Sequence, residues 1–493
     1  MIISKNHNGE LKHYGGDYWH VRVQNNQPVE NRLMIPPARF SDFGNGTYLI
    51  EFPDLTRLSD SRQYILQITL DRPSEVREIV RRALSSIHIV GRKLTANLSK
   101  FNSKTPTFGE CGPFPMPGSC NFSISQGRSW YCRGREGVAD CEKSENDWKK
   151  TGELLMRKTL VPWKMSDILK KLVWENVDGL KKTVEKEGYL QTKKLLLNIT
   201  AQRERHTQYS DEELMVVNRT RYCKVFSTPL TKNQLYDEIV EKTEGKSIVM
   251  ISASLGRYVA DFYRDIYQKH AEAECTTDNK LYLTTKLSHK CEKTWNDKHG
   301  MHPRKTTCIR FVGGKKIETD FYFIPHGKPL HHGGCEKRMP WMVDSIESLS
   351  DDFLKRNKTG SDIKLLIGTG PHFSAVNPIY FYRRLVELRP VLYKFKQQFP
   401  LSKIIYKTPS YYRGNFFNQN AMISDFVAGN QVKIIKYVFS DERIVKVVDV
   451  HKSTSLLWDF MTDPPDSGSI HPGTGKSPVW MLEMVGKQVL DEF

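Results

Sequence analysis

Long hydrophobic runs are absent from this sequence of 493 residues. The best candidate, residues 247–256, is far shorter than the roughly 18 to 20 apolar residues that a helix needs to cross a bilayer. The first residues, 1–7, also lack the basic stretch and apolar core of a secretory signal peptide. We therefore predict no membrane span in this chain.

Cysteine is absent from both ends of the chain. All nine cysteines lie between residues 111 and 335, and their odd number leaves one free or paired elsewhere. Cys111 with Cys120, and Cys132 with Cys141, would close two short loops if each pair formed locally. Zinc sites usually space their cysteines by about two to four residues, so we predict structural disulfides and no metal. The other cysteines are Cys223, Cys275, Cys291, Cys308 and Cys335.

Asn-X-Ser/Thr sequons accompany these cysteines. There are six, at Asn45, Asn97, Asn121, Asn198, Asn218 and Asn357. Sequons and disulfides both belong to oxidising compartments, so the pattern favours the secretory pathway.

Basic residues outnumber acidic ones, which gives a net charge of +18 and a pI near 9.3. The charges occur in patches of mixed sign, such as residues 182–194, and no nucleic-acid-binding motif accompanies them. We therefore predict no nucleic-acid partner. A solvated surface is the first interpretation of the charge, and attraction to an acidic glycan is the functional alternative.

The length of the chain predicts two or three domains. Residues 16–72 alternate between apolar and polar side chains with turn residues between the runs, which favours an antiparallel β-sandwich of the immunoglobulin-like kind. Residues 100–145 are rich in Gly, Pro, Ser and Cys and are typical of a linker. Residues 146–215 are charged and show helical periodicity in places, for example at 189–197.

Short apolar runs separated by helical segments begin near residue 230. This pattern predicts a mainly parallel sheet covered by helices, with one helix over residues 379–399. The chemistry of such sheets lies in the loops after the strands. The runs are residues 247–251, 363–367, 402–406 and 444–448.

Polar residues follow three of these runs. Ser252 and Ser254 follow the first run, where a hydroxyl either lies at the sheet edge beside backbone N–H donors or caps the next helix. The second run leads into residues 368–373, which lack the spacing of a dinucleotide-binding loop. Asp449 ends the last run and His471 lies beyond it. Ser early, then Asp, then His is the chain order of α/β serine hydrolases.

Several segments resemble the neurexophilin and PC-esterase domain (NXPE) family. The N-terminal part resembles the family's immunoglobulin/filamin-like domain at residues 14–19, 42–48 and 73–76, and residues 130–133 with Cys141 resemble its cysteine-bearing linker. The C-terminal part resembles the PC-esterase domain, an α/β/α branch of the SGNH/GDSL hydrolase superfamily with a mainly parallel sheet. The resemblance implies three parts: an immunoglobulin/filamin-like β-sandwich over residues 10–100, a cysteine-bearing linker and helical segment over 101–235, and an SGNH-like domain over 236–493.

The family's Gly-Asp-Ser-Thr-X-Arg block falls on residues 252–257. This match implies that Ser254 is the nucleophile, and Arg257 is retained, but the Gly and Asp of the block are absent. The family's Gly-X-Gly-X-His-Phe block matches residues 368–373. The corresponding loop of the superfamily helps to build the oxyanion hole, which implies that Gly370 and His372 contact the oxyanion or the substrate.

A late His-Pro block of the family matches the chain at His471, which is implied to be the general base. Superfamily members often carry an Asp three residues before this His, where this chain has Gly468. Asp459 lies in a Trp-Asp pair, as in the family, and is the first choice for the acidic partner. Asp449 and Asp466 are the alternatives.

The resemblance implies a serine-dependent O-acetylesterase or O-acetyltransferase of the secretory pathway that acts on glycans, secreted or held in the Golgi lumen. An esterase requires no cofactor, and acetyl-CoA would serve a transferase. The altered first block keeps a second hypothesis open, a catalytically inactive SGNH-like protein whose immunoglobulin-like domain binds a protein partner outside the cell. A third hypothesis, a polyanion-binding protein, follows from the charge of +18.

Overall fold

A computed structural model describes the two terminal parts of the chain and several segments between them. These are residues 1–5, 9–25, 34–52, 63–72, 74, 77, 108–112, 117, 119–121, 131–134, 192–198, 231–252, 254–278, 304–325, 342–358, 362–369, 378–411, 425–456 and 479–493.

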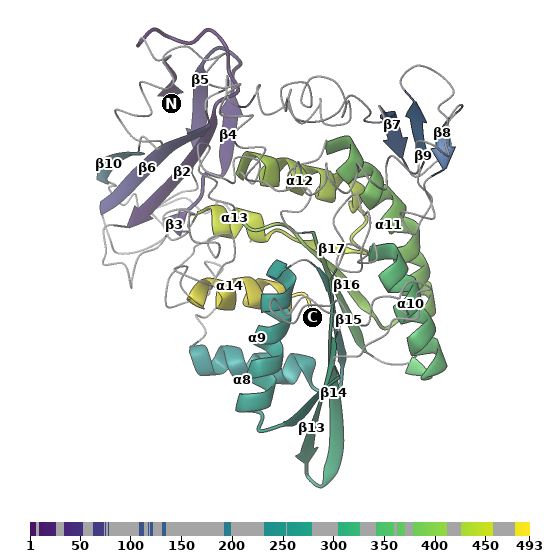
Figure 1. Ribbon diagram of the computed structural model, residues 1–493. Helices are drawn as coiled ribbons and strands as arrows, with labels where there is room; N and C mark the ends of the chain where they lie inside the picture. Colours follow the sequence, from purple (N-terminus) through teal and green to yellow (C-terminus); the bar gives the residue numbers. More distant parts are fainter. Residues whose placement is uncertain are drawn as a thin grey trace, which may run out of the picture.

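Two small antiparallel sheets form the N-terminal part (Figure 1). One has the strand order β1-β5-β4 and the other has the order β10-β6-β2-β3. The prediction of short antiparallel strands over residues 16–72 is confirmed, whereas the immunoglobulin-like sandwich stays a prediction. The strands are β1 (Ile2–Ile3), β2 (Tyr18–Asn25), β3 (Met34–Ile35), β4 (Arg39–Asp42), β5 (Thr47–Glu51), β6 (Gln63–Arg72) and β10 (Thr192–Asn198).

A tight turn joins β4 to β5, as the Gly-Asn-Gly sequence predicts. The Asp42 carboxylate accepts the backbone N–H of Gly44 at 2.8 Å, and the Asn45 side chain accepts that of Thr47 at 3.1 Å. Gly44 and Gly46 both have positive φ, 73° and 79°, which glycine adopts without steric cost.

The helical interpretation of residues 189–197 is wrong. This segment contributes β10, which pairs antiparallel with β6 over its whole length, from Thr192 opposite Thr69 to Asn198 opposite Gln63. A run of three leucines suits a helix or a strand, and pairing with the open edge of β6 satisfies its backbone groups. The four-stranded sheet is therefore completed by a segment far along the chain.

A third antiparallel sheet has the order β7-β9-β8 and comes from the predicted linker. Its strands are β7 (Phe108–Gly112), β8 (Ser119–Asn121) and β9 (Tyr131–Gly134). Cys132 is opposite Cys111 on one side and opposite Cys120 on the other. The predicted disulfides within 111–120 and 132–141 concern side chains outside the described part, and they stay predictions.

The C-terminal part is an α/β domain with a seven-stranded, mostly parallel sheet of order β12-β13-β14-β11-β15-β16-β17. All four predicted strands and the predicted long helix are confirmed. The elements are α8 (Lys232–Thr243), β11 (Ser247–Ser252), α9 (Ser254–His270), β12 (Glu274–Asp278), β13 (Arg304–Val312), β14 (Lys315–Pro325), α10 (Met342–Lys355), β15 (Ile363–Gly368), α11 (Pro378–Gln398), β16 (Lys403–Lys407), α12 (Asp425–Val438), β17 (Lys446–Val448), α13 (Val450–Ser455) and α14 (Val479–Leu490). Within the parts of the chain that the structure describes, no helix combines the length and apolar character needed to span a bilayer.

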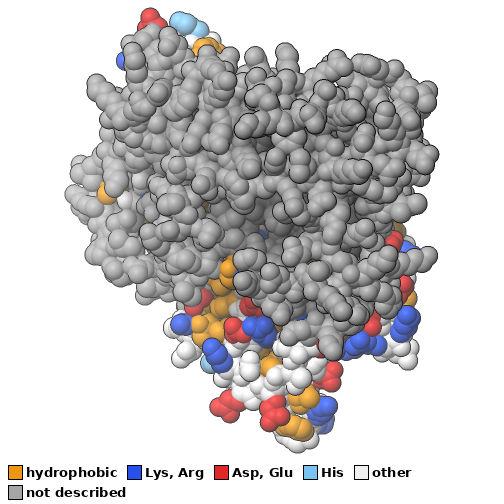
Figure 2. Space-filling view, viewed as in Figure 1, with side chains coloured by type: hydrophobic (Ala, Val, Ile, Leu, Met, Phe, Trp, Pro, Cys, Tyr) orange, Lys and Arg blue, Asp and Glu red, His pale blue; other side chains and the backbone are white. Residues whose placement is uncertain are grey.

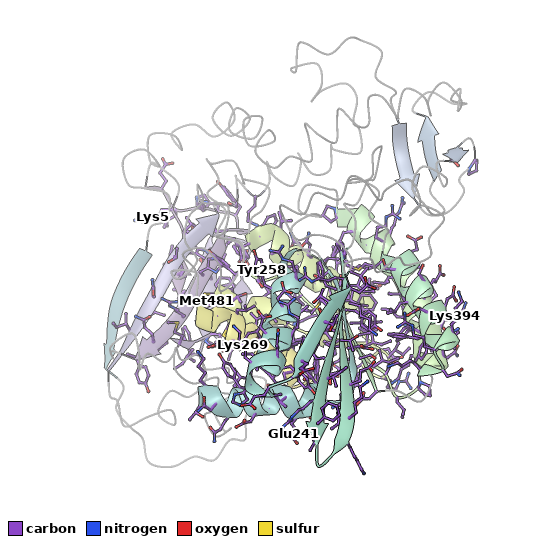
Figure 3. All side chains as sticks on the ribbon, turned by 60° about the horizontal axis from the view of Figure 1, so that its bottom comes forward. Lys5, Glu241, Tyr258, Lys269, Lys394 and Met481 are labelled. Carbon is purple, nitrogen blue, oxygen red and sulfur yellow. A yellow bond between two sulfur atoms is a disulfide. The ribbon has the colours of Figure 1, made fainter. Side chains whose placement is uncertain are left out.

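Helices cover both faces of this sheet (Figure 1). Successive residues of a strand point to opposite faces, so Ile248 and Met250 of β11 pack with α8, α9 and α14, whereas Val249 and Ile251 pack with α10 and α11. Figure 3 shows Met481 of α14 in the layer between the N-terminal strands and the parallel sheet. The uninterrupted apolar runs of the sequence follow from this burial on both faces.

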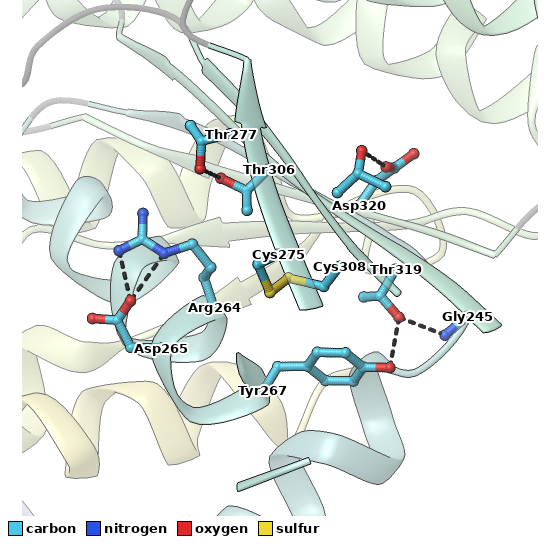
Figure 4. Close-up of a disulfide and its surroundings, with 11 residues drawn as sticks. Gly245, Arg264, Asp265, Tyr267, Cys275, Thr277, Thr306, Cys308, Thr319 and Asp320 are labelled. Atoms are coloured by element: carbon cyan, nitrogen blue, oxygen red, sulfur yellow. Dashed lines mark hydrogen bonds and ion pairs between the residues drawn. A yellow bond between two sulfur atoms is a disulfide. The ribbon is translucent and has the colours of Figure 1, made fainter. Parts of the chain in front are cut away.

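A disulfide between Cys275 and Cys308 joins the edge strand β12 to its antiparallel neighbour β13 (Figure 4). On the same strands, the hydroxyl groups of Thr277 and Thr306 lie 2.9 Å apart. Beside the disulfide, the Thr319 hydroxyl of β14 donates to the Tyr267 hydroxyl at 3.0 Å. These contacts fix the antiparallel edge of the sheet against α9.

Strand β2 of the N-terminal part packs against the helices α12 and α13 of the α/β domain. The Tyr18 hydroxyl donates to Asp425 at 2.6 Å. Arg22 is fully buried, donates to Gln67 at 2.8 Å and donates to the backbone carbonyl of Leu456. Buried polar contacts therefore join the two parts of the molecule.

Candidate functional site

The connections that follow the neighbouring parallel strands β11 and β15 diverge at the carboxyl edge of the sheet. The chain leaves β11 toward α9 on one face and leaves β15 toward α11 on the other face. Where neighbouring parallel strands send their loops to opposite faces, ligands bind outside the carboxyl ends of the strands. The ends of β11 and β15, Ser252 and Gly368, are direct register partners at this point.

Two glycines make room for the Ser252 side chain at the end of β11. A methyl group on Gly256 would lie 2.1 Å from the Ser252 Cβ, and one on Gly368 would lie 2.8 Å from the Ser252 Oγ. Ser252 itself is 1% exposed. The extra side chain at residue 252, where the family block has Gly, is therefore accommodated because both neighbouring positions lack a side chain.

Ser254 is the first residue of α9 and follows the end of β11 by two residues. The backbone N–H groups of a first helical turn have no partner within the helix and carry the positive end of its dipole. The Ser254 side chain lies outside the described part. Arg257 belongs to the same turn, and its guanidinium lies 4.7 Å from the ring centroid of Tyr258. Figure 3 shows Tyr258 on α9, beside the sheet.

Asp449 follows β17 and caps the short helix α13. Its carboxylate accepts the backbone N–H of Lys452 at 3.1 Å and pairs with Lys436 at 2.6 Å. Burial opposes the ionised form, but the hydrogen bond and charge of Lys436 hold the pKa of Asp449 below its usual value. Both carboxylate oxygens of Asp449 thus already have partners, the backbone N–H of Lys452 and the Lys436 side chain.

Lys407 ends β16 at the same edge and is 2% exposed. Its Nζ donates to the backbone carbonyl of Thr408 at 3.1 Å, and no carboxylate among the described residues pairs with it. Burial alone lowers the pKa of Lys407 to about 8. The sequence prediction placed the end of this strand at residue 406 and overlooked Lys407, although a lysine directly after an apolar run was a visible signal.

A second buried group lies around Asp425, at the junction with the N-terminal sheet. One carboxylate oxygen of Asp425 lies 2.6 Å from His451 Nε2, and the other accepts the Tyr18 hydroxyl and lies 3.4 Å from His20 Nε2. Burial opposes both charges, yet each partner stabilises the other, so the pKa of Asp425 is lowered and that of His451 is raised. These contacts join β2 to α12 and α13, so we interpret the group as a structural junction.

The remaining predicted site residues lie outside the described residues. They are Gly370, His372, Asp459, Asp466 and His471. The structure therefore places Ser254, Arg257 and Asp449 at one edge of the sheet and does not test the catalytic roles predicted for them. Within the described ranges, no group of three or more His, Cys, Asp or Glu side chains is arranged to hold a metal ion.

In a comparison with known families, residues 282–473 match the family described as NXPE family member 4-like, C-terminal domain. This stretch includes β13 to α13, Asp449 and His471, and it begins after Ser254. Neither a curated protein nor a solved structure matches the chain.

Proposed function

The chain belongs to the NXPE family, and we propose that it is a serine-dependent acyl-transfer protein, an O-acetylesterase or O-acetyltransferase that acts on glycans in the secretory pathway. In this proposal the α/β domain is of the SGNH type and the N-terminal sheets belong to an immunoglobulin/filamin-like domain. Glycans or glycoproteins are the substrates. An esterase would transfer the acetyl group of the glycan to water, whereas a transferase would transfer it from acetyl-CoA to the glycan.

The position of Ser254 is the observation that supports this proposal most strongly. It opens α9 directly after the central strand β11, at the point where the connections of β11 and β15 diverge. An acyl carbonyl near this residue would meet the unpaired N–H groups of the first helical turn, which stabilise an oxyanion. A nucleophile between a buried strand and a helix is also the arrangement of other α/β serine hydrolases.

The proposed reaction has two steps. The Ser254 oxygen attacks the acyl carbonyl while His471 takes its proton, and backbone N–H groups at Ser254 and in the Gly370 loop bind the oxyanion. The leaving group departs with the proton from His471, and an acyl-enzyme remains. Water or a sugar hydroxyl then takes the acyl group, which gives an esterase or a transferase. In this proposal Arg257 and His372 contact the substrate.

An acidic partner must orient His471 for this step. Asp449 serves this role poorly because its carboxylate already binds the first turn of α13 and Lys436. We therefore propose Asp459 as the acid and Asp466 as the second choice.

Intact mass after treatment with a serine-directed fluorophosphonate tests the proposal. We expect one adduct on the wild-type protein and none on Ser254→Ala or His471→Ala. Ser252→Ala is the matched control, because its hydroxyl is buried two residues away and the adduct should remain. A folded wild-type protein without an adduct would refute serine catalysis.

A second candidate function is a catalytically inactive binding protein. Ser252 and Ala253 stand where the family block has Gly and Asp, and Ser252 fills space at the end of β11. Loss of this Asp removes a group that could order the nucleophile turn. Absence of the adduct would place this function first, with the immunoglobulin-like domain as the partner-binding part.

Charge supports polyanion binding less well. On the described part of the face in Figure 2, Lys and Arg side chains alternate with Asp and Glu, and no continuous basic stripe gathers there. A polyanion-binding protein would bind heparin with steep salt dependence, and Ser254→Ala would leave that binding unchanged.

A further inference from the structure

Lys407 is a buried amine at the carboxyl edge of the sheet. Its Nζ makes one hydrogen bond, to the backbone carbonyl of Thr408, and no carboxylate of the described residues pairs with it. A charged group in such a place is strongly unfavourable, so the amine is driven toward its neutral form. A neutral amine is a base, and its lone pair can accept a proton.

The charged groups of the surrounding elements are engaged with other partners. Asp449 pairs with Lys436, and His451 pairs with Asp425. Arg257, in the first turn of α9, lies against Tyr258. Since burial alone accounts for the lowered pKa of Lys407, about 8, none of these groups restores its charge.

The strand register places Lys407 in one row with the start of the proposed active site. Lys407 is opposite Gly368, and Gly368 is opposite Ser252. Ile405, two residues before Lys407 and therefore on the same face, belongs to the buried cluster that includes residues of α9, the helix that Ser254 begins. The backbone of Lys407 lies about two strand spacings, roughly 10 Å, from that of Ser252, and the glycine between them has no side chain.

From this arrangement we propose that Lys407 is the general base for the acceptor in the second step of the acyl transfer. In this proposal the acceptor hydroxyl binds above Gly368, in the row between Lys407 and residue 252 and next to the start of α9. Its proton passes to Lys407 Nζ while its oxygen bonds to the acyl carbon. The bond from that carbon to Ser254 Oγ then breaks, and Lys407 returns the proton to Ser254. This inference rests on the proposed role of Ser254 as nucleophile.

The two steps can be measured separately with 4-nitrophenyl acetate. The initial burst of nitrophenolate reports acylation of Ser254, and the steady rate reports transfer to water. For Lys407→Met we expect an unchanged burst, a steady rate about 100-fold lower, and accumulation of acetyl-Ser254 in the intact mass. The wild-type steady rate should rise with pH around a midpoint of about 8, and this dependence should be lost in the variant.

Two further variants separate a base from a structural lysine. Lys407→Arg keeps the positive charge but cannot lose its proton, so its steady rate should fall like that of Lys407→Met. Lys403→Met changes the exposed lysine at the opposite end of the same strand and should match the wild type. A normal burst with an unchanged steady rate in Lys407→Met refutes the role of Lys407 but leaves the proposed role of Ser254 standing. A wild-type protein that hydrolyses the ester no faster than Ser254→Ala refutes the proposed function and the role of Lys407 with it.

Discussion

Crowding at the end of β11 gives the sharpest prediction of this structure. In Gly256→Ala the new methyl would lie 2.1 Å from the Ser252 Cβ and 2.3 Å from its Oγ, distances that no real contact allows. The backbone must therefore shift. Overpacking of this kind costs about 1–3 kcal/mol, and the better helix propensity of Ala returns about 1 kcal/mol. We expect a net loss of up to about 2 kcal/mol in the free energy of unfolding.

The second substitution of this test is Ser252→Gly, which removes both crowding atoms. Glycine in a strand costs about 0.5–1 kcal/mol on its own. In the double variant the next atom beyond the two that Ser252 loses is the Met250 sulfur, at 3.1 Å from the methyl introduced at residue 256, and a methionine side chain can move. The two changes should therefore couple favourably by about 2 kcal/mol.

Urea denaturation of the wild type, both single variants and the double variant gives this coupling. Gly429→Ala is a matched control, because that helical glycine has no neighbour closer than the Tyr18 hydroxyl at 3.3 Å and should not couple to Ser252. Additive effects of Gly256→Ala and Ser252→Gly would refute the packing described for the nucleophile turn.

Three other perturbations test the junction and the edge of the sheet. His451→Gln should lower the melting temperature most between pH 3.8 and 6.5, where both His451 and Asp425 are charged. Above this range His451, whose pKa is raised, loses its proton and its contribution to stability, and below it Asp425, whose pKa is lowered, gains a proton and loses its contribution. Thermal melts across pH would show a constant difference between the variant and the wild type if the pair is not ionised. Replacing Cys275 and Cys308 by Ala opens a loop of 33 residues and should lower the free energy of unfolding, measured by urea denaturation, by about 3–4 kcal/mol. A variant as stable as the wild type would contradict this expectation. Arg22→Met leaves buried acceptors unpaired, should cost about 2–3 kcal/mol, and should speed proteolysis at the junction; unchanged cleavage would count against this contact.

The strands of the α/β domain could be predicted because burial on both faces leaves uninterrupted apolar runs in the sequence. The nature of residues 192–198 could not be predicted, because three leucines in a row fit either periodicity and only the edge of β6 selects a strand. The state of Lys407 depends on strands and helices that meet only in three dimensions. The partnership of Asp425 and His451 likewise joins residues 26 positions apart, and no local pattern marks it.

Strand β10 has a consequence for how this protein is made. The ribosome releases β2 and β6 roughly 120 residues before the strand that completes their sheet, which corresponds to about 6–24 s at ordinary rates of synthesis. During this time the edge of β6 presents unpaired backbone groups that can recruit other chains. Folding helpers that cover strand edges would therefore matter most in this interval, and slowing translation between the two segments should increase aggregation of the newborn chain.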